Sequence, residues 1–286
     1  MSNIKIAAMT TLYNPTKYNI DNIINYIDEV DKIYVIDNTD NKTNKELMPN
    51  NKKIDYISDN TNYGIAKAIN IAAEKAINDG YKYLLTMDQD SKMTNDILKQ
   101  MKEFLKQTKI KKIGLISPYQ DIGSDEEIPD EECTDVIEMM TSGNIIDLEV
   151  YKKVGGFKDW LFIDCVDTEY CMNLHVHGYK VLRLNRVIMK HDLGELKVHK
   201  LFNKEYPCYN HSPIRRYYIV RNNLYINEMY NYYYPDYCNH LIRVQKGQVK
   251  RIIAFEKNKI KKLKMMLKGY LDFKHGIKGK YKEGGK

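Results

Sequence analysis

Hydrophobic positions follow two rhythms in the first 120 residues of the chain. The short apolar runs with the length of buried strands are IKIAAMT, KIYVID, IDYIS, YKYLLTM and IGLIS. Between them, apolar residues recur at every third or fourth position, which predicts amphipathic helices over YNIDNIINYIDEV, YGIAKAINIAAEKAIN and TNDILKQMKEFLKQ. Strands that alternate with helices at this spacing favour a mainly parallel sheet that is covered by helices on both faces.

The alternation weakens after residue 120 and ends at about residue 195. An acidic stretch at 120–131 that is rich in turn-forming residues is typical of a surface loop. A strand and turn follow in CTDVIEMMTSGNIID, and a helix is expected from about Val166 to His177. Two more helical stretches complete the chain, PIRRYYIVRNNLYINEMY and the tail after residue 240. We therefore expect an α/β domain over 1–195 and a helical extension over 196–286.

Charge is divided unevenly along the chain. The net charge is +7, but residues 241–286 hold 15 Lys and Arg against 3 Asp and Glu, which leaves 30 against 35 elsewhere. A basic tail on an acidic body indicates an anionic partner for the tail, either a membrane surface or a nucleic acid. Residues 213–237 do interleave basic and aromatic side chains. No recognised nucleic-acid-binding module surrounds them, however, so we expect no nucleic acid as a partner.

The basic tail also carries a recurrent apolar pattern. Its apolar residues at roughly helical spacing are Ile242, Val249, Ile252, Ile253, Phe255, Ile260, Leu263, Met266 and Leu267. A helix with one apolar stripe and a cationic face can lie in the interface of an anionic membrane. The alternative is that the stripe packs on the α/β domain or on a second subunit of a homodimer, with the lysines solvated.

Composition narrows the class of protein further. Hydrophobic residues make up 43% and charged residues 29%, as in soluble globular proteins, and no apolar run approaches the ~18 residues of a membrane span. The sequence MSNIKIAAMTT enters a strand-like run without the features of a signal peptide, so we expect a cytoplasmic protein. The five cysteines form no C-x-x-C pair, which argues against a structural zinc site or a disulfide framework.

Carboxylates stand at the predicted ends of two strands. Asp37 ends KIYVID, while Asp88 and Asp90 follow YKYLLTM with only Gln89 between them. The carboxyl ends of parallel strands meet at one edge of a sheet, where ligands bind, so these side chains should converge on one crevice. Two adjacent carboxylates become favourable beside Mg²⁺ or Mn²⁺, whose remaining ligands are then water and substrate phosphates. The alternative is a solvated turn that caps the next helix.

Five motifs in order resemble one enzyme family. They are MTTLYNP, YVIDNTD, the stretch NTNYGIAKAINIAAEKAINDGYKYLLTMDQDS, MTSGNIID and VGGFKDWLFIDCVDTEYCMNLHVHGYKV. Together they resemble inverting family 2 glycosyltransferases with the GT-A fold, a Rossmann-like α/β fold, over about residues 4–195. The versions with DQDS and LFID are most similar to bacterial rhamnosyltransferases of polysaccharide biosynthesis, and RRYYIVRNNL at 215–224 also resembles that subgroup.

The resemblance implies a role for individual residues. On the donor side, about residues 1–118, the implied nucleotide-binding residues are Thr11, Leu12, Tyr13, Asp37, Asn62, Gly64, Asn70 and Asp88. On the acceptor side, about residues 119–195, the implied sugar or acceptor residues are Ser142, Gly143, Asn144, Trp160, Asp164 and Glu169. The metal-diphosphate motif is Asp88 with Asp90, joined by His191, and the catalytic base is Asp167.

Some of these positions depart from the family or have a simpler explanation. Many relatives have Glu-Asp where this chain has Val166-Asp167, and Asp40 replaces a residue that is usually small. Asp167 could instead be a carboxylate that stabilises a helix N-terminus. Trp160 could pack in the core or stack on an acceptor sugar. The arginines of RRYYIVRNNL could face the diphosphate or a lipid-linked acceptor.

The resemblance implies a metal-dependent glycosyltransferase that inverts the anomeric centre. The expected reaction moves L-rhamnose from dTDP-L-rhamnose to a hydroxyl of a growing cell-surface oligosaccharide, as in capsule or O-antigen synthesis. The expected acceptor is carried on a membrane lipid, so the enzyme should be peripheral at the inner face of the cell membrane. The alternatives are transfer of another hexose from a UDP-sugar and a non-catalytic protein that binds nucleotide sugars. Pocket shape, which the sequence does not reveal, decides the donor.

Overall fold

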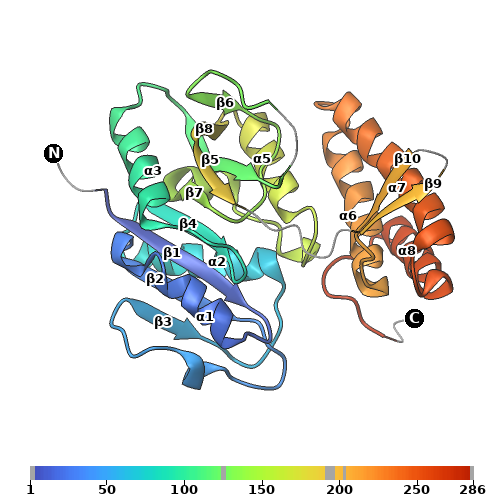
Figure 1. Ribbon diagram of the computed structural model, residues 1–286, viewed down its shortest axis with the longest axis horizontal. Helices are drawn as coiled ribbons and strands as arrows, with labels where there is room; N and C mark the ends of the chain where they lie inside the picture. The colour runs from blue at the N-terminus through green and yellow to red at the C-terminus, as the bar shows by residue number, and fades with distance from the viewer. Residues whose placement is uncertain (1–3, 124–126, 191–196, 202–203, 284–286) are drawn as a thin grey trace. The chain divides into compact units, whose positions relative to one another are not determined.

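The computed structural model describes residues 4–123, 127–190, 197–201 and 204–283. The chain divides into two compact units (Figure 1). The N-terminal unit comprises Met1–Phe162 and Val166–Asp192, and the C-terminal unit comprises Ile163–Cys165 and Leu193–Lys286. The sequence predicts a single boundary near residue 195, whereas the structure assigns three residues from the middle of the first domain to the second unit.

One mixed sheet forms the centre of the N-terminal unit. Its strands, in spatial order, are β3 (Ile54–Ile57), β2 (Lys32–Asp37), β1 (Ile6–Leu12), β4 (Tyr83–Asp88), β7 (Asn144–Asp147), β5 (Ile113–Asp121), β8 (Lys180–Lys190) and β6 (Cys133–Asp135). The first four strands are mutually parallel, β5 is parallel to β8, and β7 and β6 run antiparallel to their neighbours. The predicted, mainly parallel sheet is confirmed.

Helices cover both faces of this sheet, as the alternation in β1 requires. Ala7 and Met9 point into one hydrophobic core, and Ile6 and Ala8 point into the other. The first core is closed by α2 (Ile65–Asn78), α4 (Leu148–Val154) and α5 (Val166–Val176). The second is closed by α1 (Lys17–Ile24) and α3 (Asn95–Gln107). Short 3-10 turns lie at Ile27–Glu29 (η1), Lys45–Leu47 (η2) and Asp159–Leu161 (η3).

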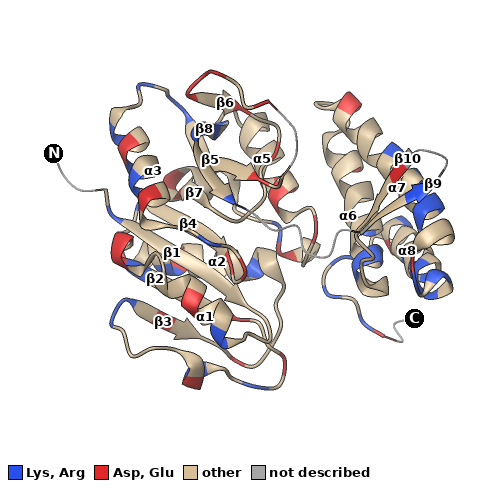
Figure 2. Ribbon diagram, viewed as in Figure 1, with Lys and Arg blue, Asp and Glu red and all other residues tan. Residues whose placement is uncertain are grey.

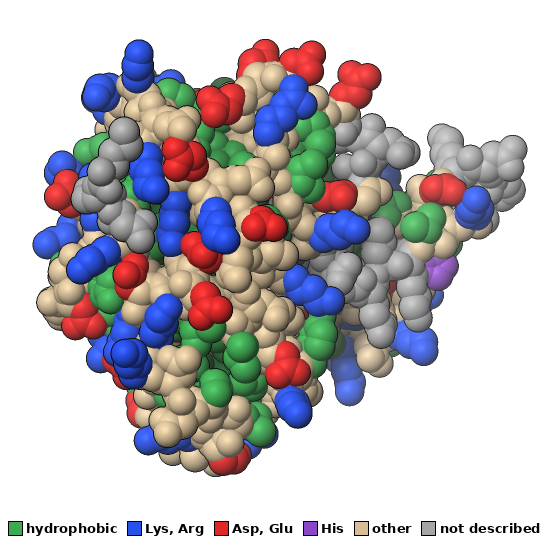
Figure 3. Space-filling model, turned by 60° about the vertical axis from the view of Figure 1, so that its left-hand side comes forward, with side chains coloured by type: hydrophobic (Ala, Val, Ile, Leu, Met, Phe, Trp, Pro, Cys, Tyr) green, Lys and Arg blue, Asp and Glu red, His purple; other side chains and the backbone are tan. Residues whose placement is uncertain are grey.

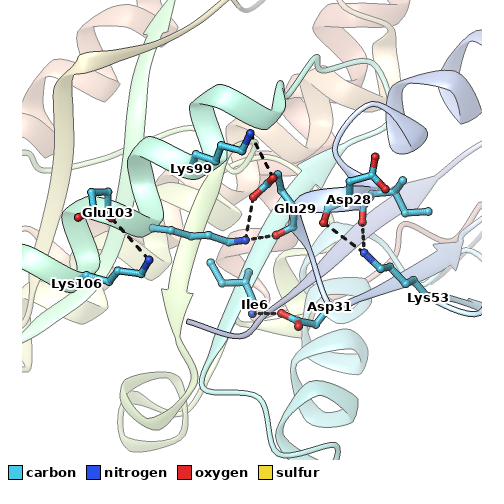
Figure 4. A network of polar contacts seen from close by, with 10 residues as sticks. Ile6, Asp28, Glu29, Asp31, Lys53, Lys99, Glu103 and Lys106 are labelled. Atoms are coloured by element: carbon cyan, nitrogen blue, oxygen red, sulfur yellow. Dashed lines mark hydrogen bonds and ion pairs between the residues drawn. The ribbon is translucent and has the colours of Figure 1, made fainter. Parts of the chain in front are cut away.

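A polar network holds the amino end of β1 (Figure 4). The backbone N–H of Ile6 donates to Asp31 Oδ2 at 2.9 Å. Lys102 of α3 reaches Glu29 of η1, where its Nζ lies 3.3 Å from Oε2 and also donates to the backbone carbonyl. These contacts lie at the amino end of β1. Asp37 and Asp88 lie at the carboxyl ends of β2 and β4, at the opposite edge of the sheet.

The described residues of the C-terminal unit form a β-hairpin and three helices. The hairpin pairs β9 (Lys197–Leu201) with β10 (Lys204–Cys208), and the helices are α6 (Pro213–Tyr230), α7 (Pro235–Phe255) and α8 (Lys259–Lys274). The basic tail is therefore two helices, because the chain turns between Glu256 and Asn258, where Asn258 has a φ of 55°. The hairpin is a feature that hydrophobic periodicity did not predict.

The apolar stripe of the tail divides between the inside and the outside of this unit. Ile252 and Met266 are buried against Val220 of α6, and the partly buried Leu224, Val249 and Leu263 pack against them. Ile253, Ile260 and Leu267 instead keep 54%, 71% and 58% of their surface exposed. Much of the predicted stripe thus packs within its own unit, on a helix that the sequence did not single out as its partner.

Charged side chains also lie inside the C-terminal unit. Glu256 accepts from Arg216 at 2.6 Å and from Lys262 at 2.8 Å, and all three side chains are at most 2% exposed. Arg221 is fully buried and donates to the carbonyl of Gly279 at 2.6 Å. Arg216 and Arg221 therefore bind groups of this unit, which corrects the expectation that they face a diphosphate or an acceptor.

The two units differ in the charges they present. Figure 2 shows Lys and Arg along α8, while acidic and basic residues are both scattered over the N-terminal unit. Side chains of both signs are interspersed on the face shown in Figure 3. Among the described residues, none of the helices combines the length and the apolar character that crossing a membrane requires.

Candidate active site

The strand ends that carry the predicted site residues lie side by side. β1 is flanked by β2 and β4, and the register pairs Leu12 with Asp37 on one side and Thr11 with Asp88 on the other. The predicted convergence of Asp37 and Asp88 at one edge of the sheet is therefore confirmed. Thr11 and Leu12 are buried, while Tyr13 directly after β1 is 51% exposed.

The turn after β4 presents its two aspartates differently. Asp88 is half-buried at the end of the strand, whereas Asp90 is exposed in the turn that follows. The turn is closed by a bond from the N–H of Ser91 to the carbonyl of Asp88 at 3.3 Å. Asp90 is therefore accessible from solvent, and Asp88 is partly accessible.

Gln89, between the two aspartates, is a site residue that sequence reasoning missed. Its side chain accepts from the N–H of Tyr13 at 2.9 Å and donates to the Tyr13 carbonyl at 3.2 Å. Its own carbonyl accepts from the side chains of Asn19 and Asn22 of α1. Gln89 thus ties the aspartate turn to the end of β1. Its position between two acidic residues was the only signal available in the sequence.

The Ser-Gly-Asn turn predicted beside the sugar lies directly against the aspartate turn. Ser142 Oγ accepts from the N–H of Asp88 at 3.1 Å, and the N–H of Gly143 donates to the carbonyl of Thr86 at 2.8 Å. Gly143 has a φ of 88°, a conformation that favours glycine. Ser142 and Asn144 are buried; Ser142 contacts Asp88, whereas the side chain of Asn144 donates to the carbonyl of Met140 at 2.9 Å.

Asp37 organises the loop that follows β2. Its Oδ1 accepts from the N–H of Thr39 at 3.0 Å, and its Oδ2 accepts from the side chain of Asn44 at 2.8 Å and from the Tyr56 hydroxyl. Burial would raise the pKa of Asp37, but these hydrogen bonds outweigh it and hold the pKa below the usual value. The contact of Asp37 with a pyrimidine base stays a prediction.

Hydrogen bonds join the loop before α2 to the residues that follow β2. Asn38 donates to the carbonyl of Gly64 at 3.0 Å, and Asn62 accepts from the N–H of Gly64 at 2.9 Å. Asp40 accepts from the N–H of Asn62 at 3.0 Å, which gives this unexpected carboxylate a role in the loop. Gly64 has a φ of 82°, and a Cβ there would lie 2.4 Å from the carbonyl oxygen of Phe162, so no larger residue fits.

Asn70 and Trp160 have contacts that bear on their predicted roles. Asn70 donates to Phe157 and Asp159 and accepts from Tyr151 and the N–H of Phe157. These four bonds fill the capacity of an amide, so a contact with the nucleotide would require one of them to break. Trp160 is half-buried and packs against the hydrophobic core, which favours the core alternative over a stacking platform.

Asp167 lies at the wall of a pocket. It is the second residue of α5, is half-buried, and its Oδ1 accepts from the N–H of Thr168 at 2.9 Å. The pocket has a volume of about 400 Å³ and is lined by Tyr119, Gln120, Ile122, Glu138, Met139, Met140, Asp167 and Arg183. Its charged side chains of both signs suit a polyhydroxylated ligand, and Thr168 fixes Glu138 through a bond of 2.8 Å.

Two further residues predicted to contact the acceptor are Glu169 and Asp164. Glu169 is fully buried in α5, and its contact with the acceptor stays a prediction. Asp164 belongs to the C-terminal unit, where its Oδ1 accepts from Arg215 at 2.9 Å. Burial raises the pKa of Asp164, although the neighbouring Arg215 lowers it.

The protein offers few ligands for a metal ion in the described part of the chain. No group of three or more His, Cys, Asp or Glu side chains there could hold one. His191, the third predicted ligand, lies outside the described residues. Asp88 and Asp90 supply hard oxygen donors, which fits Mg²⁺ or Mn²⁺ if diphosphate and water complete the coordination shell.

Comparison with known proteins identifies the family. The sequence model of glycosyl transferase family 2 matches residues 14–164. The chain is also 30% identical over 298 residues to the dTDP-rhamnosyl transferase RfbF of Shigella flexneri, covering 97% of this chain and 98% of that protein. The chain belongs to glycosyl transferase family 2.

Solved structures show that this glycosyltransferase has the GT-A fold. Staphylococcus aureus TarS 1–349 in complex with UDP-GlcNAc matches with a TM-score of 0.56 and 14% identity, covering 96% of this chain and 81% of TarS 1–349. GalNAc-T7 with UDP, GalNAc and Mn²⁺ matches with a TM-score of 0.57 and 14% identity, covering 96% of this chain and 56% of that chain. At this identity both structures establish the fold alone.

Proposed function

We propose that this enzyme transfers L-rhamnose from dTDP-L-rhamnose, with inversion, to a hydroxyl of a growing cell-surface oligosaccharide. The similarity to a dTDP-rhamnosyl transferase over almost the full length of both chains supports the donor. The observation that carries the chemistry is the placement of Asp88 and Asp90 at a strand end beside the Ser-Gly-Asn turn, with Asp167 at the wall of a separate polar pocket.

Asp88 and Asp90 are proposed to hold a divalent cation together with the donor diphosphate. A bound Mg²⁺ or Mn²⁺ would act as a Lewis acid that stabilises the negative charge of the leaving diphosphate. The backbone N–H of the half-buried Asp88 donates to Ser142, and Gln89 holds the turn, so the backbone that carries both carboxylates is fixed before the donor arrives.

Asp167 is proposed to be the general base. The acceptor hydroxyl lies in the 400 Å³ pocket and gives its proton to the carboxylate of Asp167 while its oxygen attacks the anomeric carbon. The bond from that carbon to the diphosphate breaks, and the diphosphate leaves with the bonding electrons. Because attack and departure occur on opposite faces of the sugar, the product has the inverted configuration. Glu138 and Arg183 would hydrogen-bond other hydroxyls of the acceptor.

A screen of nucleotide sugars tests the donor. Thermal unfolding is followed with dTDP-L-rhamnose and a panel of UDP-sugars in the presence of Mg²⁺ or Mn²⁺. The preferred donor at about 100 times its dissociation constant should stabilise the protein by roughly 2.7 kcal/mol. If a UDP-sugar stabilises the protein and dTDP-L-rhamnose does not, the donor is that UDP-sugar and the proposal of a rhamnose donor is wrong. Stabilisation without transfer or donor hydrolysis would instead support a non-catalytic protein that binds nucleotide sugars.

The C-terminal unit is proposed to bind an anionic membrane surface, where a lipid-linked acceptor would lie. α8 buries Met266 and Gly269 on one side. On the opposite side, Ile260, Leu267 and Leu271 are 71%, 58% and 42% exposed. The exposed lysines of α8 are Lys259, Lys261, Lys264 and Lys274. An apolar stripe between cations fits an interface with acidic lipid headgroups, and each cation adds about 1 kcal/mol at best.

Vesicle binding tests the membrane proposal without disturbing the helical core. The double variant Ile260→Gln/Leu267→Gln should lose sedimentation with phosphatidylglycerol vesicles at low salt. The matched control Ile253→Gln changes an exposed isoleucine of α7 and should bind as the wild type does. High salt and neutral vesicles should both weaken binding. Equal sedimentation of all three proteins would remove this face of α8 from the mechanism.

A further inference from the structure

A second, much smaller cavity shares Asp167 with the 400 Å³ acceptor pocket. The carboxylate residue lines both spaces. The smaller cavity has a volume of about 10 Å³, which is room for one water molecule. Its walls include Asn144 at the start of β7 and Tyr170 of α5, and every residue that lines it belongs to the N-terminal unit.

Two buried polar atoms of these walls need a partner. Within the described part of the chain, no protein group hydrogen-bonds to the hydroxyl of Tyr170 or to Oδ1 of Asn144. Tyr170 is 0% exposed and Asn144 is 3% exposed. Buried polar groups are almost always hydrogen-bonded, because a group left unpaired loses its hydration and gains nothing in return. The two atoms therefore point to a small polar ligand in the cavity.

Other contacts hold both side chains in place. The ring of Tyr170 stacks on Phe157, with the ring centroids 4.0 Å apart. The amide nitrogen of Asn144 donates to the carbonyl of Met140 at 2.9 Å, which fixes the direction of Oδ1. Turning either group toward a new protein partner would break these contacts, so the partner has to enter the cavity.

The donors and acceptors around the cavity match one water molecule. Burial raises the pKa of Tyr170 well above its usual value, so its hydroxyl keeps the proton and can donate it to a hydrogen bond. Oδ1 of Asn144 and an ionised carboxylate at Asp167 can only accept. A water that accepts from Tyr170 and donates to the other two satisfies all three groups, and about three hydrogen bonds are typical of a buried water.

We propose that one buried water molecule connects Tyr170 and Asn144 to the carboxylate of Asp167, and that Tyr170 is a positioning residue for this base. The inference rests on the proposed role of Asp167 in proton transfer. Asp167 and Tyr170 are three positions apart in α5, so they are neighbours on one side of the helix. The hydrogen bond from the water favours the ionised carboxylate, which is the form that takes the proton of the acceptor hydroxyl.

The water is one of several groups that act on Asp167. Glu138 and Arg183 are the other charged residues of the acceptor pocket. Cys171 lines the small cavity, and burial raises the pKa of its thiol, so it carries no charge there. Removing the hydroxyl of Tyr170 leaves all three of these residues in place, so it isolates the contribution of the water.

A high-resolution crystal structure of the full chain tests the water directly. The expected result is an ordered water within hydrogen-bonding distance of the Tyr170 hydroxyl, Asn144 Oδ1 and the carboxylate of Asp167. A dry cavity would overturn the proposal.

Urea unfolding of Tyr170→Phe gives a second test, because the two explanations of the hydroxyl predict opposite signs. If the hydroxyl binds the water, its loss should raise the equilibrium constant for unfolding about fivefold. If the hydroxyl has no partner, the variant should be as stable as the wild type or more stable, because a buried unpaired group has been removed. That second result would overturn the proposal.

The pH profile separates positioning of the base from simple stabilisation. In Tyr170→Phe, the acidic limb of the kcat profile, which reports the ionisation of the base, should move to higher pH by about half a unit or more. The matched control Tyr26→Phe removes a buried hydroxyl that pairs with Thr10 at 2.7 Å on the other face of the sheet. It should lower stability without moving the limb.

Asp167→Asn distinguishes a failure of this inference from a failure of the proposed function. If Asp167→Asn retains normal turnover, the proposed base is wrong and the positioning role falls with it. If Asp167→Asn is inactive while the limb of Tyr170→Phe coincides with that of the wild type, only the positioning role is overturned.

Discussion

Carboxylates occupy opposite environments in the two units of this glycosyltransferase. In the N-terminal unit, Asp88 is half-buried and Asp90 is exposed, and both stand at the end of a strand. In the C-terminal unit, the side chain of Glu256 is 1% exposed and accepts from Arg216 and Lys262. Breaking a buried ion pair is costly, because the remaining charge is left without compensation. The exposed Asp90 is open to solvent, so replacing it should cost little stability.

This difference predicts that carboxylates of the first kind control activity and those of the second kind control stability. The following experiments measure activity, stability or both, and each tests one side of this difference.

Asp167→Asn should have the largest effect on turnover. The amide fills the same space but takes no proton, so kcat should fall by about 10²–10⁴-fold. Donor affinity and melting temperature should remain close to those of the wild type, as measured by calorimetric titration and thermal unfolding. An equal loss of donor affinity would make Asp167 a binding residue.

Glu256→Gln should have the largest effect on stability. It leaves Arg216 and Lys262 buried without their anion, which should cost about 3–5 kcal/mol in the free energy of unfolding. Urea unfolding measures this loss, and the exposed Glu228→Gln on α6 is the matched control, with an expected change within about 0.5 kcal/mol. A similar, small change in both variants would show that the buried ion pairs of Glu256 contribute little to the free energy of unfolding.

Asp88→Asn and Asp90→Asn should lower kcat by about 10²–10³-fold, since each removes a proposed metal ligand and a metal supplies several kcal/mol to the leaving group. The exposed Asp90→Asn should leave the melting temperature unchanged. The stabilisation of the protein by donor with Mn²⁺ should decrease in both variants. Near-normal transfer by both would contradict the metal site.

Gly64→Ala tests whether the donor loop tolerates a side chain. Its Cβ would collide with the Phe162 carbonyl, whereas Gly80, with a φ of 80°, has open space around it. Gly80→Ala should therefore cost only the backbone strain, about 1–2 kcal/mol, and Gly64→Ala should cost more. The difference in the free energy of unfolding between the two variants isolates the close approach. Equal losses would mean that the loop moves aside without resistance.

His211 should make a smaller, pH-dependent contribution to the free energy of unfolding. Burial, reinforced by Arg215 and Arg216, lowers its pKa to about 4, against about 6.5 in an unfolded chain. The unfolded state binds the proton first, so this contribution to stability is complete above about pH 6.5 and is lost as the pH falls toward 4. Between pH 7 and 5 the loss should be on the order of 1 kcal/mol after solvent screening. Urea unfolding of His211→Gln should show a smaller difference between the two pH values, and an undiminished difference would exclude His211 as its source.

The fold and part of the site could be predicted because they depend on local patterns. Alternating strands and helices imply a parallel sheet, and the carboxyl ends of parallel strands meet at one edge. This rule predicted that Asp37 and Asp88 lie at the same edge, and the strand register agrees. Gln89 could not be assigned, because its partner Tyr13 is 76 positions away. The bonds of Asn70 to residues 157 and 159 were hidden for the same reason.

By itself, the sequence determined the periodicity of the elements, the carboxylates at the strand ends and the basic character of the tail. Only the tertiary structure decided which of those charges are inside. Lys262 and Arg216 look like solvated cations along the chain, yet both are buried on Glu256. Lys262 is only 6 positions from Glu256, whereas Arg216 is 40 positions away and reaches it because α6 packs against α8. The segment Ile163–Cys165 likewise reads as part of the first domain, but bonds from α6 assign it to the second unit. Periodicity is a property of neighbours in sequence, whereas burial and pairing of charge depend on partners that only folding brings near.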